Sequence, residues 1–343
     1  MRRMLNVLYV TNPDAYLTKD GENLVVKVHD QETFRTPIHY LEGIVTFGFM
    51  GATPALLGLC VDKGVTVSFM SPYGKHLATV HGPPKGNVLL RRKQYRWADA
   101  EGESAGMAAM FVMGKLANCR SVLRRFIRDY GDKTETDGIE KVSRLLTKNI
   151  LRLAKPIGLD ELRGVEGESA RCYFSVLDRL IVSQKEDFTL RGRNRRPPLD
   201  NVNALLSFLY SLLLHETRAA LETVGLDPYV GFLHRDRPGR ASLALDMMEE
   251  MRPYLADRLA LNLINRRQVS GDEFVKKESG GIVMKDSARK TVLEAWQKRK
   301  KEEITHPFLE EKIPLGLLPY VQALLLARCL RGDLDSYPPF FWK

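Results

Sequence analysis

His81-Gly82-Pro83-Pro84-Lys85-Gly86-Asn87 separates two parts of the chain whose apolar residues follow different spacings. Glycine and proline interrupt regular structure, so we expect a linker here. Before it, short runs of β-branched and aromatic residues alternate with turn-forming residues, as strands do. These runs predict strands at residues 5–10, 24–28, 44–48 and 65–70, with a short helix at 54–63.

After this segment, apolar residues recur about every 3.6 positions, which is the period of an α-helix. The pattern predicts helices at 87–99, 104–129, 138–154, 159–183 and 201–224, and a β segment at 281–284. The sequence therefore predicts an α+β fold: an N-terminal β-sheet domain at residues 1–82, a linker at 83–90 and a predominantly α-helical domain at 91–343. A chain of 343 residues is long enough for two such domains.

The composition narrows the class of protein. The chain carries 52 Lys and Arg against 42 Asp and Glu, a net charge of +10, which favours polyanionic partners. Its four cysteines lie far apart and form no Cys-x-x-Cys pair, so neither a disulfide framework nor a cysteine-rich metal site is expected. The longest apolar stretch, residues 47–60, is too short and interrupted to cross a bilayer, and the N-terminus lacks the apolar core of a signal peptide. We expect a cytoplasmic protein with reduced cysteines and no membrane partner.

Basic residues are clustered rather than spread evenly. Four arginines precede Pro197, and two further runs occupy residues 91–93 and 298–301. A solvated helix face or loop end explains any single run equally well. Several runs together favour contact with a phosphate backbone, which is independent of sequence and sensitive to salt. The candidates for DNA contact near residue 195 and in the loop after His234 are Arg191, Arg193, Arg195, Arg196, Arg235, Arg237 and Arg240.

Potential metal ligands are scattered along the helical part. Glu166 is flanked by Gly164 and Gly167, which predicts close approach by a backbone or a phosphate, although close helix packing explains the glycines equally well. His234 follows two apolar residues, a context that is more often a hydrogen-bonded core histidine than a ligand.

The segment after His234 adds carboxylates. Ser242 is expected to cap a helix that begins at Leu243 and that Pro253 ends or kinks. On it, three carboxylates (Asp246, Glu249 and Glu250) have helical spacing and are expected to repel one another. Either they form a solvated acidic face, or a divalent cation relieves the repulsion. One imidazole with carboxylates suits Mg²⁺ or Mn²⁺ better than zinc.

Three segments together resemble a known family. Residues 163–174 contain Arg163-Gly164-Val165-Glu166-Gly167, residues 195–206 begin Arg195-Arg196-Pro197-Pro198, and residues 231–250 begin Gly231-Phe232-Leu233-His234. In this order they resemble the motifs of CRISPR-associated protein one, the CRISPR adaptation integrase, and the similarity extends over nearly the whole chain. The pattern is most similar to the branch that accompanies type I systems, with subtype I-C as the expected subtype.

The resemblance implies the chemistry of the site. Proteins of this family hold Mg²⁺ or Mn²⁺ with residues that correspond to Glu166, His234 and Glu249, which would make the helical domain catalytic. Asp246 falls where the family often has a further acidic residue. Several branches have aspartate at the last ligand position, so whether Glu249 or Asp246 contacts the metal stays open here.

The resemblance also implies function and partners. The expected reaction inserts short foreign DNA fragments into the CRISPR repeat array by attack of a 3′-hydroxyl on a repeat phosphodiester. The expected partners are double-stranded DNA, a second copy bound through the β domain, a dimer of the small CRISPR-associated protein two that bridges two such dimers, and an end-processing nuclease. The alternatives are a structure-selective, metal-dependent DNA nuclease in repair, or a non-catalytic nucleic-acid-binding scaffold in which Glu166, His234 and Glu249 are structural.

Overall fold

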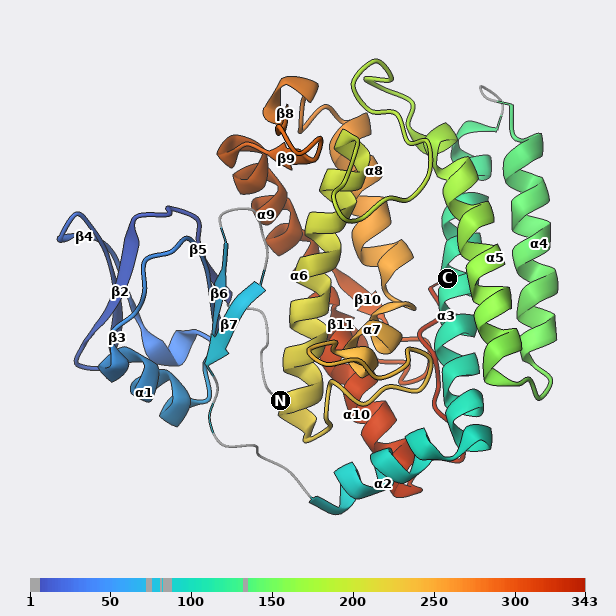
Figure 1. Ribbon diagram of the computed structural model, residues 1–343, viewed down its shortest axis with the longest axis horizontal. Helices are drawn as coiled ribbons and strands as arrows, with labels where there is room; N and C mark the ends of the chain where they lie inside the picture. Colours follow the sequence, from blue (N-terminus) through green and yellow to red (C-terminus); the bar gives the residue numbers. More distant parts are fainter. Residues whose placement is uncertain (1–6, 72–75, 81, 83–87, 132–134, 343) are drawn as a thin grey trace.

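The computed structural model describes residues 7–71, 76–80, 82, 88–131 and 135–342. Seven strands and one α-helix precede a long helical region, so the fold is α+β as predicted (Figure 1). The β part lies at one end of the molecule beside helix α6, and helices α3, α4 and α5 lie at the other end.

The N-terminal part contains two small sheets. Four strands pair in the order β1-β5-β6-β7, with β7 antiparallel to β6 and the other pairs parallel. They are β1 (Val7–Val10), β5 (Gly43–Phe47), β6 (Thr66–Met70) and β7 (His76–Val80). The second sheet is an antiparallel meander of β2 (Ala15–Asp20), β3 (Asn23–Val28) and β4 (Gln31–Pro37). A short 3₁₀ helix, η1 (Ile38–Tyr40), follows it.

Helix α1 (Pro54–Lys63) closes the core of this part. The Thr53 hydroxyl accepts a hydrogen bond from the Leu56 amide, and Gly64 ends the helix with a left-handed φ of 72°. Leu56 and Cys60 pack with residues of both sheets, among them Leu17, Leu24 and Val67. The predicted bounds of this helix are confirmed because its two end signals are local.

The four-stranded sheet also packs against the helical region. Val45, Phe47 and Met70 belong to the large core of the helices, and the ring of Phe47 lies 6.0 Å from that of Phe208 on α6 (Asn201–Val224). A polar contact accompanies this packing: the Tyr9 hydroxyl donates to Glu216 Oε1 at 3.3 Å. The two parts are therefore joined by buried contacts as well as by the chain.

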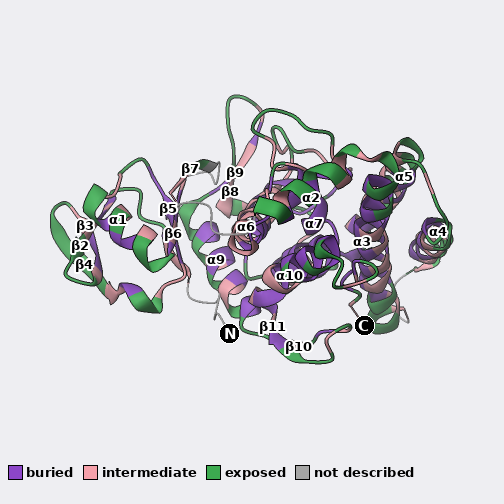
Figure 2. Ribbon diagram, turned by 90° about the horizontal axis from the view of Figure 1, so that it is seen from below, coloured by how far each residue is buried: buried purple, intermediate pink, exposed green. Residues whose placement is uncertain are grey.

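The helical region is built from long helices with a buried face (Figure 2). The first group comprises α2 (Val88–Asp99), α3 (Glu101–Tyr130), α4 (Asp137–Leu153) and α5 (Leu159–Leu177). The rest comprises α6, α7 (Ser242–Met248), a π-helical turn η3 (Pro253–Asp257), α8 (Arg258–Asn265), α9 (Asp286–Lys300) and α10 (Leu318–Arg331).

Short elements complete the region. Two hairpins pair β8 (Phe274–Lys276) with β9 (Ile282–Met284) and β10 (Glu303–Thr305) with β11 (Lys312–Pro314). Three 3₁₀ helices lie at element ends: η2 (Asp178–Leu180), η4 (Gly271–Glu273) and η5 (Leu315–Leu317). Helix α6 has its predicted bounds, since Asp200 caps its start and Gly225 ends it with a φ of 86°.

In the N-terminal part three described strands escaped the sequence prediction, as did the short strands β8, β10 and β11 of the helical region. β2 and β4 carry charged side chains, and five of the seven residues of β4 are exposed, so neither shows an apolar run. β7 was likewise not predicted.

Helix α5 ends at Leu177 rather than at residue 183, because Asp178 accepts a hydrogen bond from the Leu190 amide at 2.7 Å and the chain turns back. In the expected linker, residues 83–87 lie outside the described ranges, and Val88 to Leu90 already form the first turn of α2, where Leu90 is buried.

Candidate metal and nucleic-acid site

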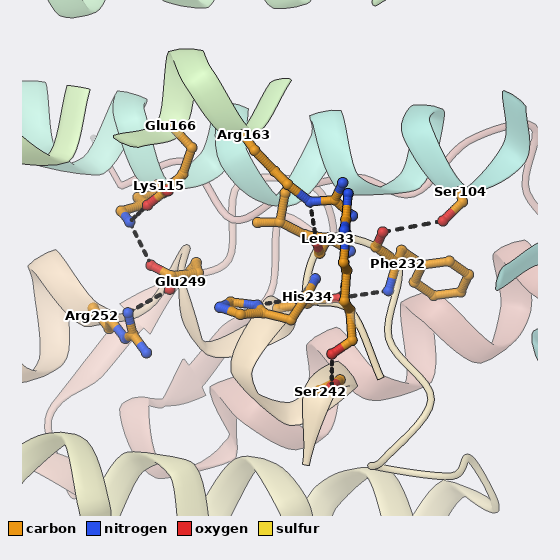
Figure 3. Close-up of polar contacts among 12 residues, drawn as sticks. Ser104, Lys115, Arg163, Glu166, Phe232, Leu233, His234, Ser242, Glu249 and Arg252 are labelled. Atoms are coloured by element: carbon orange, nitrogen blue, oxygen red, sulfur yellow. Dashed lines mark hydrogen bonds and ion pairs between the residues drawn. The ribbon is translucent and has the colours of Figure 1, made fainter. Parts of the chain in front are cut away.

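A buried cluster of charges forms where α3, α5 and the C-terminal end of α7 meet (Figure 3). The Lys115 ammonium on α3 lies 2.5 Å from Glu166 Oε1 on α5 and 2.7 Å from Glu249 Oε2. Arg252 pairs with the other oxygen of Glu249. Two glutamates that are 83 residues apart in the chain (249 − 166) therefore meet at one cation.

The charges of this cluster support one another. Only 4% of the Glu249 side chain and 9% of the Lys115 side chain is exposed, whereas 26% of the Glu166 side chain reaches solvent. Burial opposes ionisation of Glu249, but the charges of Arg252, Lys115 and His234 outweigh it and lower its pKa. Burial likewise opposes the charge on Lys115, but Glu249 and Glu166 raise the pKa of its ammonium. The cluster is a network of ions in which Glu166 provides the access to solvent.

The partner of the second Glu249 oxygen is a cation. Glu249 Oε2 is buried, and the Lys115 ammonium lies 2.7 Å from it. A buried carboxylate needs a positive partner of this kind. The place of the ammonium between two carboxylates fits a position that a hard cation can occupy or share, because carboxylate oxygens are the ligands that Mg²⁺ and Mn²⁺ prefer.

Asp246 fixes His234 instead of facing the cluster. It is fully buried, and its Oδ2 accepts the backbone amides of Phe232 (2.6 Å) and Leu233 (2.9 Å). Its Oδ1 accepts the backbone amide of His234 at 3.0 Å and lies 2.5 Å from His234 Nδ1. Gly231 is required beside it, because an added Cβ would lie 2.7 Å from Asp246 Oδ2.

This arrangement sets the role of the histidine. A carboxylate only accepts hydrogen bonds, so Nδ1 of His234 carries the proton and Nε2 keeps its lone pair when the ring is neutral. The imidazole extends toward Glu249 and Arg252 (Figure 3). Four hydrogen bonds fill the lone pairs of Asp246, which leaves Glu249 as the carboxylate of this helix that can bind a metal.

The expected mutual repulsion of three carboxylates is wrong. Asp246, Glu249 and Glu250 are all buried, and each has partners of its own in a different direction, so they form neither a solvated acidic face nor one acidic pocket. Glu250 accepts hydrogen bonds from the Tyr337 hydroxyl (2.5 Å), Gln322 Nε2 (3.0 Å) and the Phe340 amide (2.8 Å). The helix breaks after Met248, and the π-helical turn that begins at Pro253 redirects the chain.

Two local predictions also need correction. The helix begins at Ser242 and its cap is Ala241, because the Ser242 hydroxyl donates to the Arg235 carbonyl and does not accept from the helix. Gly164 and Gly167 meet no close neighbour: a Cβ at either position would have nothing within 4 Å. Close helix packing therefore does not explain these glycines, and the space beside Glu166 is open.

The candidate DNA-binding arginines divide into two kinds. Arg193 points inward: it donates to Asn203 Oδ1 (2.7 Å) and Ser207 Oγ (3.1 Å) and lies over the ring of Tyr210. Arg240 is half-buried. Burial lowers the pKa of Arg240, and the positive charges of Arg237, Arg195 and Arg196 lower it further. The two loops therefore bring positive charge to one place, and the exposed members are Arg191, Arg195, Arg196, Arg235 and Arg237.

The basic run at 298–301 is different. Arg299 and Lys300 are buried, with the Arg299 guanidinium donating to the Tyr254 carbonyl and the Lys300 ammonium 2.7 Å from Glu216. These two side chains hold the helices together and are not available to a phosphate. In the run at 91–93, Arg92 and Lys93 are exposed.

The sequence analysis missed Lys115, although the chain contains a signal for it. Lys115 lies in an apolar helix segment, four residues after Phe111 and four residues before Cys119. Both of these neighbours are buried, and residues at this spacing lie on one side of a helix. A lysine on a buried helix face requires a partner. Within the described residues, no three His, Cys, Asp or Glu side chains already converge as metal ligands, since Lys115 and Arg252 occupy the space around Glu249.

Comparison with known proteins identifies the family. The family model described as CRISPR associated protein Cas1 matches residues 8–298. The chain belongs to the Cas1 family. It is 50% identical over 343 residues to CRISPR-associated endonuclease Cas1 1 of Chlorobaculum tepidum, and 51% identical over 350 residues to Cas1 2 of Rhodospirillum rubrum, with each chain covered fully. The expected family is thereby confirmed, while subtype I-C stays a prediction.

Other similar proteins carry additional parts. A CRISPR-associated exonuclease Cas4/endonuclease Cas1 fusion of Geobacter sulfurreducens is 36% identical over 97% of this Cas1 chain and 60% of the fusion. Among solved structures, a casposase bound to its integration product superposes with a TM-score of 0.85 at 21% identity, covering 98% of this chain and 94% of that one. A Cas6-RT-Cas1–Cas2 complex gives 0.82 at 23% identity, covering 100% and 36%. These last two likenesses show the fold.

From its sequence, the chain is not expected to cross a membrane. No helix within the described ranges is long and apolar enough to cross a bilayer.

Proposed function

We propose that this Cas1 chain is a DNA integrase of CRISPR adaptation that uses Mg²⁺ or Mn²⁺. The single observation that carries the proposal is that two carboxylates from distant parts of the chain, Glu166 and Glu249, meet at the Lys115 ammonium, on the side toward which the His234 ring extends (Figure 3). Glu166, Glu249 and Nε2 of His234 are the residues that would hold the cation. When bound, it would supply Lewis-acid stabilisation of charge on a phosphodiester.

The other residues of the site have positioning and electrostatic roles. Asp246 holds the His234 ring with Nδ1 protonated, so that Nε2 is available on the side of Glu249. Arg252 fixes Glu249 by pairing with one of its oxygens. The Lys115 ammonium offsets negative charge as a phosphate approaches the open side of the cluster at Glu166.

The proposed reaction is a transesterification. The 3′-hydroxyl oxygen of a captured fragment bonds to phosphorus in the repeat, the bond from phosphorus to the repeat's bridging 3′ oxygen breaks, and the proton of the attacking hydroxyl is lost as the departing oxygen gains one. One phosphodiester replaces another, so no external energy source is required. With water as the attacking group, the same site would act as an endonuclease, which agrees with the activity named for the relatives.

The surrounding charge supports DNA as the substrate. Arg195, Arg196, Arg237 and Arg240 come together, and the exposed members of this group can contact the sugar–phosphate backbone of the captured fragment and of the repeat. Arg193 has a structural role in this proposal, since its donors are engaged within the chain.

We infer the assembly from the relatives. The Cas6-RT-Cas1–Cas2 complex supports a Cas2 partner for this chain, and the Cas4/Cas1 fusion supports an end-processing exonuclease. We further propose a homodimer formed through the β domain, with Cas2 bridging two dimers in the cytoplasm.

The test is a joining assay. The protein and its Cas2 are incubated with a labelled short duplex, a repeat-bearing supercoiled plasmid, and Mg²⁺ or Mn²⁺. We expect label to become covalently attached to the plasmid, and a fragment with dideoxy 3′ ends to remain unattached. Glu166→Ala and His234→Ala should abolish attachment, whereas Glu294→Ala, which removes an exposed carboxylate on α9, should preserve it.

The outcomes separate the alternatives. A repair nuclease cuts branched DNA and leaves no joined product. A non-catalytic scaffold binds DNA without metal-dependent cutting or joining. Integration is refuted if the wild type attaches no label, or if Glu166→Ala and His234→Ala join as well as the wild type does.

A further inference from the structure

Residues of α3 and α4 line an open basic groove. These two helices lie at the end of the molecule away from the β domain (Figure 1). The volume of the groove is about 740 Å³, and its walls include Arg120, Arg124, Arg125, Arg128, Arg144 and Trp342. Glu140 is the one carboxylate among its lining residues, so five positive charges against one negative leave an excess of four. This groove is separate from the residues discussed above.

The arginines of α3 form a row. Arg120, Arg124 and Arg128 are four residues apart, which places them on one side of the helix at intervals of about 6 Å along its axis. A row of guanidinium groups along one helix matches a chain of phosphates better than it matches a single small anion. The geometry therefore favours an extended polyanion.

Part of this charge is not neutralised within the chain. Arg124 is exposed and makes no ion pair with any described residue. Arg125 and Arg128 share Asp129, at 3.4 Å and 3.1 Å, while Arg144 pairs with Glu140 at 3.3 Å. These pairs are at the surface, where an ion pair contributes little and exchanges readily for a phosphate.

The C-terminal tail gives the groove a fixed wall. The Trp342 carbonyl accepts from the Ser121 hydroxyl at 3.1 Å, and the Trp342 amide donates to Asn118 Oδ1 at 2.8 Å. The guanidinium groups of Arg258 and Arg125 lie 4.3 Å and 5.7 Å from the indole centre. Hydrogen bonds and cation–π contacts thus hold the Trp342 wall, and the indole contacts one of the groove's arginines, Arg125.

The groove faces away from the catalytic cluster. Arg124 follows Lys115 by nine residues, which is about 2.5 turns and about 14 Å along α3. Half a turn beyond two full turns places it on the opposite side of the helix. A DNA segment in the groove therefore differs from the segment at Lys115.

We propose that the α3–α4 groove binds the sugar–phosphate backbone of a DNA segment outside the catalytic pocket. The choice of DNA as the polyanion rests on the proposed function. The binding is independent of base sequence, because arginine contacts with phosphates carry no sequence information. Its place in the reaction is to hold DNA that flanks the reacting strand, so that the strand stays at the site during the chemical step.

The test measures DNA binding without divalent metal. Fluorescence anisotropy with a single-stranded and a duplex oligonucleotide, in EDTA and over a range of salt concentrations, compares the wild type with the double variant Arg124→Ala/Arg128→Ala. Losing two phosphate contacts should reduce the slope of log K against log salt by about 1.8 for duplex or about 1.4 for a single strand. The groove binds the form of DNA, single-stranded or duplex, for which the variant shows the smaller salt slope.

The control removes the same charge elsewhere. Arg328→Ala/Arg331→Ala deletes two exposed arginines of α10 and should leave both slopes unchanged. Unchanged thermal stability of both double variants verifies that they fold. The proposal is overturned if Arg124→Ala/Arg128→Ala keeps the wild-type slope for both oligonucleotides, or if the control loses as much; an acidic protein partner would then be the remaining explanation for the groove.

Failure here is distinct from failure of the proposed function. If the wild type joins DNA but the groove variant keeps its slope, integration stands and the groove assignment is wrong. If the groove variant loses slope but the wild type joins nothing, the groove assignment stands and integration is wrong.

Discussion

Replacing Lys115 with methionine tests the central cluster directly. Methionine keeps the length of the lysine stem and removes the ammonium that lies 2.5 Å from Glu166 and 2.7 Å from Glu249. The variant therefore leaves two carboxylates without their shared cation while disturbing the packing of α3 little. We expect it to be unstable without metal and to be restored by Mn²⁺.

The magnitude follows from burial. Breaking a buried ion pair by removing one partner costs about 3–5 kcal/mol. The lower end applies here, because Arg252 still pairs with Glu249 and 26% of the Glu166 side chain is exposed. For a chain of this size a loss of about 3 kcal/mol lowers the melting temperature by roughly 4 °C. A cation at 100 times its dissociation constant returns about 2.7 kcal/mol, which is nearly the whole loss.

The assay is thermal unfolding in EDTA and in a series of Mn²⁺ concentrations. The wild type should show a smaller rise with Mn²⁺, because there the cation competes with the ammonium. Lys300→Met is the matched control: Lys300 is also buried and lies 2.7 Å from Glu216, which is not part of the cluster. That variant should also lose stability, but Mn²⁺ should not restore it.

Two results would refute this reasoning. If Mn²⁺ raises the melting temperature of Lys115→Met no more than that of Lys300→Met, the cluster does not bind a divalent cation. If Lys115→Met is as stable as the wild type in EDTA, the ion network does not hold α3, α5 and the end of α7 together. Neither readout depends on enzymatic activity.

Three further predictions concern Asp246, Glu250 and the arginines that precede Pro197. Asp246→Asn should weaken Mn²⁺ affinity about 10–100-fold, measured by the same thermal titration, because it no longer fixes the His234 ring; an unchanged affinity would remove its positioning role. Burial raises the pKa of Glu250 from 4.5 to about 7. The folded state then keeps a proton that the unfolded chain releases, and stability falls as pH rises between these values. Urea unfolding at pH 5 and 8 measures this decline in the free energy of unfolding, and Glu250→Gln should abolish up to roughly 3 kcal/mol of it. An equal decline in the wild type and in Glu250→Gln would contradict the role of Glu250. Arg193→Ala should lower the melting temperature, whereas Arg195→Ala should keep it and reduce the salt slope of DNA binding by about 0.9; the reverse pattern would show that their roles are exchanged.

The comparison of sequence and structure is clearest at helix ends. Helices α1 and α6 have their predicted bounds because Thr53 and Asp200 cap them and Gly64 and Gly225 end them. Such caps act within four residues, so the sequence contains all of the information they need. The polar strands β2 and β4 escaped prediction because their pairing partners, and not their own side chains, make them strands.

At the site, too, local motifs could be predicted from the sequence and contacts between distant segments could not. Glu166, His234 and Glu249 were predicted from motifs, but their arrangement was not. Three carboxylates at helical spacing implied one acidic face, whereas the tertiary structure turns Asp246 toward the loop at 231–234 and Glu250 toward the C-terminal tail. Spacing along a helix gives the side of the helix and says nothing about which distant donor meets each carboxylate.

The sequence by itself determined the order of β and helical parts, the ends of the best-capped helices, the family, and the candidate ligands, because each of these depends on residues close together in the chain. Only the tertiary structure decided that Lys115 lies between Glu166 and Glu249 and that Asp246 orients His234. It also decided that the arginine row of α3 lines an open groove with Trp342. The physical reason is that ion pairs, burial and hydrogen bonds between distant segments are set by how the helices pack, and these contacts decide which charged side chains are shared, oriented or left open to a ligand.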